Sequence, residues 1–595
     1  MIRWHPKHWW KPAVLDGLGP LSALLAISIF VMGEGWTKMH SLVIGGGNAT
    51  TPSDVNGTLW FYWWTATAQA RGVDRLTPDV ICAPTGQSLG SNFPQHIDAL
   101  MAAPLFANLA FPAGFNLWVA LIPVLGGFAA WLAARWLGLG RASAFMVAVL
   151  FGFNSLSMHE LANGKPPSAL VFTLPLFIGS WLKCITSPGR SALAWVVVAG
   201  FATALAIQHY VLYALLAAFF AAGTLAVHSI RPSPGVGRRR MVIASAMVVL
   251  IGLSFSAPYL QRLLGERRPM PAAMAPSIQD PAIIREQGES IDVGYIFGVD
   301  TDEDLPRRAA FPVVLTLAAF LLIPVGGTRH RRWLAAAVGF YLLSLGPMAA
   351  TSVRPEVEWM TIAGRGVPLP TWWLNQIFPF SIQFFHPCRV FPMVVLCMSM
   401  AVGTGLQHWG RRWGDSRRLI SPAIAVIIAG IGFFHVRAQG GMHLLTAPWS
   451  PHPFFEQLAA SESPGSIIEF PLGLGHATAP DQLVHEWSRS ESHHDFIAAL
   501  KSGDRPEDCY QLPIFTPLWD LSRGDSPQAP SQAHISGAAQ AGFQYLIVWR
   551  AGFDVLRQAG LNVDREGSIR ILRKWFGTPL LADEQLVVWA IEENP

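Results

Sequence analysis

The chain has 595 residues, of which 51% are hydrophobic and only 13% are charged, and its mean hydropathy is +0.35. Soluble domains carry roughly 25% charged residues, so this composition excludes a series of ordinary soluble domains over most of the chain. The formal net charge of +4 is too small to indicate a nucleic-acid-binding protein, and no basic recognition motif accompanies it.

Apolar runs of nearly twenty residues recur along the first three quarters of the chain. About twenty apolar residues cross a bilayer as a helix, and these runs are continuously apolar rather than alternating, which favours helices over barrel strands. We therefore predict about eleven transmembrane helices. The expected ranges are 17–34, 115–135, 142–158, 168–185, 191–208, 210–229, 241–263, 309–327, 333–350, 388–406 and 419–436. The runs starting at 142, 168 and 191 are short, so two of them are candidates for half-helices or tilted helices. The first run lacks a small-residue cleavage site and is expected to be retained.

Basic residues in the short connections predict the orientation of these helices. They fall on the side of the N-terminus if the helices alternate: Arg3, Lys7, Lys11, Arg135, Arg141, Lys183, Arg190, "RPSPGVGRRR" (231–240), "TRHRRW" (328–333) and "GRRWGDSRR" (410–418). An excess of Lys and Arg marks the cytoplasmic side, so we expect a cytoplasmic N-terminus and an external C-terminal tail. The external loop 264–308 also holds five arginines, but loops of that length follow the rule poorly.

The first external loop, 35–114, contains an acid beside a cluster of aromatic residues. In "SDVNGTLWFYWW" (53–64), Asp54 precedes Trp60 and Trp63. The segments 59–70 and 96–111 are typical of helices at the membrane interface. The tryptophans have two interpretations, a membrane belt or a surface that stacks on a sugar. Asp54 has three: a solvated loop residue, a helix cap, or a general base near the bilayer, where a low dielectric raises a carboxyl pKa.

The composition changes in the tail from about residue 438. The stretches "SIIEFPLGLG" (466–475), "GFQYLIVWR" (542–550) and "LLADEQLVVWAIEE" (580–593) indicate strands among polar, Pro-rich loops. We therefore predict an all-α transmembrane domain over 1–437 and an external α/β domain over 438–595. The tail shows no clustered acid or nucleophile, so it is not expected to hold the catalytic centre.

Several polar residues fall on the external side near the ends of the expected helices. They are Lys165, Arg354, Arg365, Arg389, His159, His209, His386 and Tyr210. Cations at a membrane edge commonly extend to lipid headgroups, and a lone histidine there is commonly structural. If the cations converge, they would instead form a phosphate site, since Arg matches phosphate oxygens bidentately.

Other kinds of site find little support in the sequence. We find no P-loop, dinucleotide fingerprint, zinc site or nucleophile elbow, and ATP-driven transport has no motif in the chain. The five cysteines, Cys82, Cys184, Cys388, Cys397 and Cys509, show neither metal spacing nor a disulfide framework. The acidic stretch 292–306 lacks the spacing of a calcium loop and is expected to be solvated.

The order of these motifs resembles a known family. A basic N-terminus, one helix and a long loop opening on Asp54 and "NGTLWFYWW" are followed by "PTGQSLGSNFP" (84–94), "FGFNSLSMHELANGKPPSALVFTLPL" (151–176), "QHYVLYALLAAFFA" (208–221) and "HPCRVFP" (386–392). This order resembles the GT-C superfamily of membrane glycosyltransferases. It is most similar to bacterial multispan proteins that resemble those glycosylating teichoic acid, the YfhO-like proteins.

The resemblance implies a GT-C-like fold in a bacterial inner membrane and transfer of a sugar from a polyprenyl-phosphate donor to an envelope glycan, lipid or protein. Asp54 takes the place of the catalytic acid of the first loop. Better-studied members often have two adjacent acids there, whereas here the neighbours are Ser53 and Val55. No cofactor is therefore assigned, and a divalent cation, Mg²⁺ or Mn²⁺, is left open. Two alternatives also stay open: a non-enzymatic transporter or flippase for lipid-linked glycans, and an envelope assembly scaffold.

Overall fold

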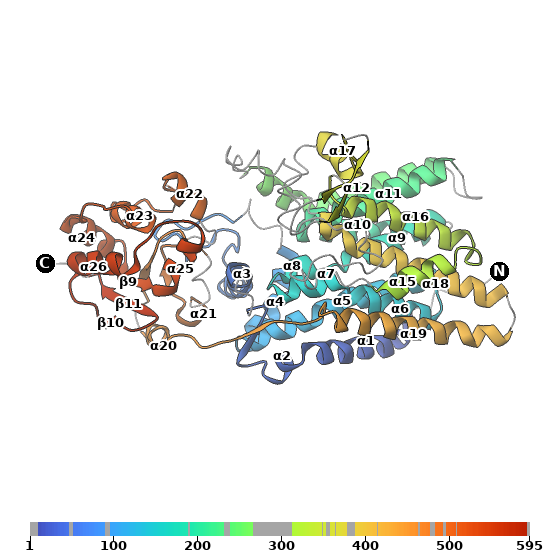
Figure 1. Ribbon diagram of the computed structural model, residues 1–595, viewed down its shortest axis with the longest axis horizontal. Helices are drawn as coiled ribbons and strands as arrows, with labels where there is room; N and C mark the ends of the chain where they lie inside the picture. The colour runs from blue at the N-terminus through green and yellow to red at the C-terminus, as the bar shows by residue number, and fades with distance from the viewer. Residues whose placement is uncertain are drawn as a thin grey trace. The chain divides into compact units, whose positions relative to one another are not determined.

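The structure is a computed structural model of the whole chain (Figure 1). It describes residues 10–46, 52–89, 96–187, 191–230, 238–265, 312–347, 349–352, 358–362, 365–377, 387–412, 415–461, 464–475, 482–491, 496–506 and 509–591. These residues form two compact units. The helical unit comprises Met1–Gly45, Pro94–Asp98 and Asn116–Thr446, and the sheet unit comprises Gly46–Phe93, Ala99–Phe115 and Ala447–Pro595.

The helical unit is built mainly from long apolar helices, several of which run side by side in Figure 1. They are α1 (Trp10–Met32), α5 (Ala113–Trp136), α6 (Arg141–Gly152), α7 (Ser155–Ala162), α8 (Pro166–Ala169), α9 (Thr173–Thr186), α10 (Ser191–His209), α11 (Val211–Ile230), α12 (Arg238–Gly265), α15 (Val313–Leu321), α16 (Gly327–Ser344), η3 (Pro387–Val390), α18 (Phe391–Arg412) and α19 (Asp415–Ala438). Shorter elements complete this unit: α2 (Glu34–Thr37), β1 (Leu42–Ile44), β2 (Ala350–Ser352), β3 (Glu358–Trp359), β4 (Thr361–Ile362), β5 (Arg365–Gly366) and α17 (Pro370–Ile377).

A helix lies at each of the eleven predicted spans, but not all of them are long and apolar enough to cross a membrane. Within the described residues, eight spans meet that requirement. The helix at the predicted span 309–327 covers only Val313–Leu321, because Pro324 and two glycines follow it. The helix at 333–350 starts earlier, at Gly327, and takes in the basic segment 328–332, which lowers its hydropathy. The chain is a multi-pass membrane protein with an all-α membrane domain, as predicted.

Two of the three short spans are interrupted helices. The first breaks between α6 and α7, where Asn154 caps α7 by accepting a hydrogen bond from Ser157 N. The second breaks between α8 and α9, since the prolines at 166 and 167 can only begin a helix. Gly164, with φ +68°, turns the chain from α7 towards α8, and a Cβ there would be strained by this backbone conformation. Interrupted backbone at membrane depth is tolerated only where protein or a cavity surrounds it.

Basic connections that the sequence assigns to one side of the membrane contact one another. Arg141 donates a hydrogen bond to Asp16, and Arg135 Nη2 lies 3.7 Å from the same carboxylate. Arg240, at the start of α12, donates to the carbonyl oxygen of Ser187, at the end of α9. The start of α1 thus meets the end of α5 and the start of α6, and the end of α9 meets the start of α12, and each set agrees with the predicted alternation. The cytoplasmic location of this side stays a prediction.

The sheet unit contains a five-stranded sheet with helices packed around it. Its strands are β7 (Ser466–Phe470), β8 (Ser488–Arg489), β9 (Phe543–Trp549), β10 (Leu581–Ala582) and β11 (Leu586–Ala590). Its helices are α3 (Pro52–Arg71), most of α4 (His96–Asn108), α20 (Pro453–Ala459), α21 (Gln482–His485), α22 (Ile497–Ser502), α23 (Phe515–Arg523), α24 (Gln532–Gln540), α25 (Arg550–Gln558) and α26 (Arg565–Phe576). The short strand β6 (Thr446–Pro448) leads into this unit.

The strand order is β10-β11-β9-β7-β8, with β7 parallel to both β8 and β9 and the other pairs antiparallel. Successive side chains of a strand point to opposite faces, and both faces of this sheet are covered. Ile468 and Leu546 contribute to the core on one face, whereas Ile467 and Ile547 contribute to the core on the other. The predicted α/β fold of the tail is confirmed. The inclusion of residues 46–93 and 99–115 in the same unit was not anticipated.

Candidate functional site

A group of polar side chains gathers where several helices of the helical unit begin or end. We call Glu160, Tyr210, Tyr213 and Arg389 the polar cluster. Arg389, in η3, donates a hydrogen bond from Nη1 to the Tyr210 hydroxyl, and its Nε lies 3.6 Å from Oε1 of Glu160. The side chains of Arg389 and Glu160 are only 16% and 8% exposed. The cluster therefore contains a largely buried ion pair in a membrane domain.

Neighbouring elements hold the cluster in place. The Tyr213 hydroxyl, on α11, donates to the carbonyl oxygen of Ser168 in α8, and the Tyr210 and Tyr213 rings meet edge to face at 5.1 Å. Lys165 N donates to the Glu160 carbonyl oxygen at 2.8 Å, which closes the turn between α7 and α8. The end of α7, the short helix α8, the junction between α10 and α11 and the start of α18 thus meet at one place. Such a meeting of helix ends is typical of binding sites in membrane proteins.

The structure brings together part of the predicted site. Arg389 and Tyr210 are in direct contact, and the buried ring of His209 lies 6.0 Å from that of Tyr213. His159 instead pairs with Asn163, one turn further along, which fits the structural alternative. Arg354 and His386 lie outside the described residues, as do the side chains of Asp54 and Arg365.

Trp60 and Trp63 lie in the sheet unit, and their surroundings change their interpretation. Trp60 is 1% exposed, stacks on Trp64 at 6.3 Å and donates from Nε1 to Oε1 of Gln482 at 2.6 Å. Trp63 is 9% exposed. A membrane belt requires exposed rings, so that interpretation is wrong for Trp60. A role for Trp60 and Trp63 in sugar binding stays a prediction, and Trp60 has a structural role that the sequence did not indicate.

Glu160 is the main residue of the cluster that the sequence analysis missed. It lies within "HELANGKPPS", which was interpreted as an external loop, so its charge drew no attention. An acid between two apolar spans is itself a signal, because ionisable residues in membrane segments are rare and commonly functional.

The spacing of the cysteines indicated no disulfide framework, but the structure contains a disulfide. Cys82, from the first loop, and Cys509, from the tail, form a disulfide across 427 residues of sequence. No local spacing could reveal a pair so far apart. Cys184, Cys388 and Cys397 are buried free thiols.

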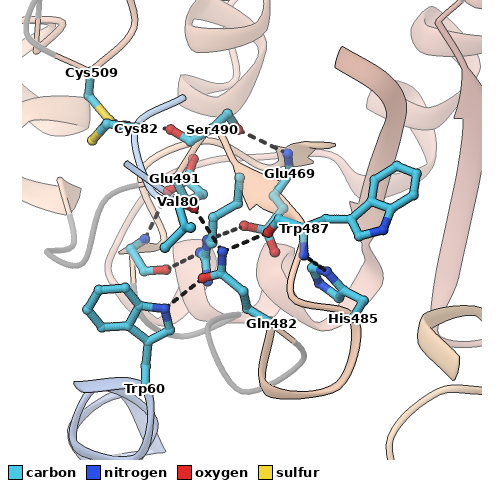
Figure 2. A network of polar contacts seen from close by, with 12 residues as sticks. Trp60, Val80, Cys82, Glu469, Gln482, His485, Trp487, Ser490, Glu491 and Cys509 are labelled. Atoms are coloured by element: carbon cyan, nitrogen blue, oxygen red, sulfur yellow. Dashed lines mark hydrogen bonds and ion pairs between the residues drawn. A yellow bond between two sulfur atoms is a disulfide. The ribbon is translucent and has the colours of Figure 1, made fainter. Parts of the chain in front are cut away.

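A second buried polar network lies in the sheet unit (Figure 2). Arg489 Nε lies 2.7 Å from the Glu469 carboxylate, and both side chains are at most 3% exposed. Glu491 accepts hydrogen bonds from the Tyr510 hydroxyl at 2.8 Å and from Gly475 N at 3.0 Å. Burial raises the pKa of Glu491 to about 7, against the opposing effect of the nearby Arg489 charge. The charged side chains at the end of β8 are thus paired with other groups of the same unit.

Metal binding remains open. Among the residues that the structure describes, no group of three or more His, Cys, Asp or Glu side chains could hold a metal ion. The Asp54 side chain is not among them, so the divalent cation considered from the family resemblance stays a prediction.

The chain is similar to known proteins in structure but does not match any of them in the sequence comparisons. No family model and no curated protein matches the chain. It is similar to the arabinofuranosyltransferase AftD from Mycobacteria, with a TM-score of 0.46 and 16% identity over 96% of this chain and 41% of that one. The chain thus spans less than half the length of AftD.

Two further solved structures are similar to nearly the whole chain. The archaeal oligosaccharyltransferase AglB from Archaeoglobus fulgidus, in complex with an inhibitory peptide and a dolichol-phosphate, has a TM-score of 0.43 and 12% identity over 91% of this chain and 70% of that one. ArnT from Cupriavidus metallidurans, bound to undecaprenyl phosphate, has a TM-score of 0.47 and 12% identity over 98% of both chains.

Proposed function

We propose that this chain is a GT-C-type glycosyltransferase that moves a sugar from a polyprenyl-phosphate donor to a cell-envelope acceptor on the outer face of the membrane. The observation that carries this proposal is the polar cluster, in which the ends of several helices surround a buried ion pair of Glu160 and Arg389. The motif order from Asp54 to "HPCRVFP" supports the same reaction class.

Arg389 is proposed to bind the donor phosphate. A guanidinium has five N–H donors in a planar fork, and the contacts to Glu160 and Tyr210 engage only part of that fork. The Tyr210 hydroxyl accepts from Arg389, and a hydroxyl in that position can donate its own hydrogen to a phosphate oxygen. Glu160 balances the cation before the donor binds. Lys165, His209, Arg354, Arg365 and His386 are proposed as further contacts to the donor or acceptor.

Asp54 is proposed as the general base. The acceptor hydroxyl oxygen attacks the anomeric carbon of the sugar, and its proton passes to the Asp54 carboxylate. The bond between the anomeric carbon and the phosphate oxygen breaks, and polyprenyl phosphate leaves. The activated group is already a lipid phosphate, so the reaction requires no nucleotide-binding fold.

The Cys82–Cys509 disulfide supports the external placement of the first loop and the tail. Disulfides persist in oxidising compartments and are rare in the cytoplasm. An external sheet unit agrees with the orientation that the basic connections predict, and with a reaction on the outer face.

The test is sugar transfer by the purified full chain, given a radiolabelled polyprenyl-phosphate sugar and cell-envelope acceptor. Asp54→Asn keeps the shape of the side chain and a hydrogen-bond acceptor but removes its basicity. Losing a positioned base lowers the rate by about 10²- to 10⁴-fold. The matched control is Asp74→Asn, an exposed acid of the same loop. Wild-type transfer by Asp54→Asn would remove Asp54 from the mechanism.

The ion pair also favours a second candidate, a transporter of lipid-linked glycans, because buried charges in membrane helices commonly lie on transport paths. An assay in sealed vesicles distinguishes the two functions. A transferase attaches the labelled sugar to the acceptor, whereas a transporter moves the lipid-linked glycan across the bilayer without forming that product.

A further inference from the structure

Helix α3 carries Asp54 in its first turn, and the buried Trp60 is one of the side chains that attach it to the tail. Trp60 follows Asp54 by six residues, which is about 9 Å along a helix axis. Its indole Nε1 donates to Oε1 of Gln482, which belongs to α21 in the tail. Residues 422 positions apart in sequence thus meet in the core of the sheet unit, as Figure 2 shows.

The side-chain amide of Gln482 is held on both of its polar atoms. Its Oε1 accepts from Trp60, and its Nε2 donates to the carbonyl oxygens of Val80 at 2.8 Å and Trp487 at 2.7 Å. An indole N–H can only donate and a carbonyl can only accept, so these three partners fix the orientation of the amide. Gln482 is only 1% exposed, so these three hydrogen bonds are shielded from bulk solvent. It therefore joins α3, the first loop and the tail.

The first loop is attached to the tail by its backbone as well. Cys82 N donates to Glu491 O and Ala83 N to Arg489 O, while Arg489 N donates back to Val80 O. The segment 80–83 therefore lies beside β8 like an added strand. The Cys82–Cys509 disulfide fastens the same segment covalently. Gln482 thus anchors α3 to a surface that is itself rigidly held.

We propose that Gln482 is a positioning residue for Asp54. This proposal rests on the proposed function, in which Asp54 is the general base. By holding Trp60, Gln482 fixes the position of α3 on the sheet unit. The position of α3 in turn sets the direction from which the Asp54 carboxylate approaches the acceptor hydroxyl. Gln482 touches neither donor nor acceptor in this proposal. Catalytic geometry is sensitive to such support, since a displacement of about 1 Å lowers a rate by about 10²-fold.

Two substitutions test the proposal kinetically. Gln482→Ala removes the whole anchor, and Trp60→Phe removes only the N–H that reaches it while keeping an aromatic ring. We expect each to lower kcat by about 10-fold or more, with the KM for the donor changed less than 2-fold. The double variant should be no slower than Gln482→Ala, because both changes break one link. A loss of folded protein would also lower the apparent kcat without changing KM, so each kcat is normalised to the folded fraction, measured by size-exclusion chromatography of the same sample.

Two matched controls accompany these variants. Trp64→Phe also removes a buried indole hydrogen bond from α3, here to the carbonyl oxygen of Arg75, but leaves Gln482 untouched. Gln558→Ala removes an exposed glutamine of the same unit. Both should keep the wild-type kcat. An effect of Trp64→Phe as large as that of Trp60→Phe would overturn the proposal, because general softening of α3 would then explain the loss.

A distance measurement tests the positioning without relying on activity. Spin labels at Ser53→Cys and Gln558→Cys report the distance between the start of α3 and α25, in a background with the three free cysteines replaced by Ser. We expect one narrow distance distribution in the otherwise wild-type chain and a broadened or shifted one after Gln482→Ala. An unchanged distribution would overturn the proposal. If the wild-type chain transfers no sugar, the proposed function fails, and a changed distribution would still show that Gln482 positions α3.

Discussion

Arg389 and Glu160 depend on each other, because each would otherwise be a largely buried single charge. Removing one partner of a buried ion pair leaves the other uncompensated and destabilises a protein by about 3–5 kcal/mol. We therefore expect Glu160→Gln to destabilise the helical unit by that amount, measured by denaturant unfolding in detergent. The double variant Glu160→Gln with Arg389→Met should recover much of the loss.

The control for this prediction is Glu34→Gln. Glu34 also pairs with a cation, Lys38 at 3.3 Å, but both side chains are more than half exposed. Exposed pairs contribute little, so the substitution should change stability hardly at all. Equal effects at Glu34 and Glu160 would contradict a special role of the buried pair.

For single residues, the sequence indicates their charge and their place along the chain, but it does not indicate which side chains they contact. Arg389 and Tyr210 were predicted as site residues because both fall at external ends of spans, and they are in contact. Glu160 was missed because a short polar stretch between spans looks like an ordinary loop. The partnership of Trp60 with Gln482 could not be predicted, because no local pattern relates residues so distant in sequence.

At the scale of elements, the loop after β7 is held by a carboxyl group with an unusual pKa. Glu491 accepts from the amides of Gly473 and Gly475, and its other neighbours are Tyr510, Arg489 and Glu469. Its pKa is raised to about 7 from 4.5, so the folded state keeps the proton that the unfolded state has lost. Stability from this group is therefore present below pH 4.5 and is lost as the pH rises towards 7.

The loss amounts to about 3 kcal/mol, since one pKa unit corresponds to about 1.4 kcal/mol. It can be measured as the free energy of opening of the peptide 466–475, by hydrogen exchange of the full chain from pH 4.5 to 8. Buried His485 has the opposite slope, because its pKa is lowered to about 3 by burial and by Arg489. His485 is present in both proteins, so the difference between wild type and Glu491→Gln isolates Glu491. If the free energy of opening changed with pH equally in both proteins, the raised pKa of Glu491 would be contradicted.

The positions of helices and strands could be predicted from the sequence where one run of apolar residues marks the element. The strands near 466, 543 and 586 were predicted because strand-like apolar residues gather there between polar, Pro-rich loops, and both faces of the sheet are indeed buried. The break between α6 and α7 was anticipated only as a short span, because Asn154 acts as a cap through a bond that hydropathy does not register. Packing of α3 with the tail depends on tertiary contacts and could not be predicted from either segment alone.

At the scale of the whole molecule, the alternation of helices predicts an external sheet unit. A cysteine probe near Gly465 should react with an impermeant thiol reagent added to intact cells, whereas one near Gly235 should be protected until the cells are opened. The physical reason is the excess of Lys and Arg in the connections on the side of residue 235. The reverse labelling pattern would invert the orientation and move the proposed reaction to the other face.

The central claim is that the polar cluster binds a lipid-linked phosphate through Arg389, and binding of undecaprenyl phosphate to the full chain in detergent tests it most directly. Charge-assisted hydrogen bonds contribute about 1.5–3 kcal/mol, which corresponds to roughly 10- to 100-fold in Kd. Arg389→Lys keeps a cation beside Glu160 but loses the planar fork, and the control Arg331→Ala removes an exposed cation elsewhere in the helical unit. We predict a Kd at least 10-fold higher for Arg389→Lys and unchanged for Arg331→Ala. Equal affinity of wild type and Arg389→Lys would contradict the claim.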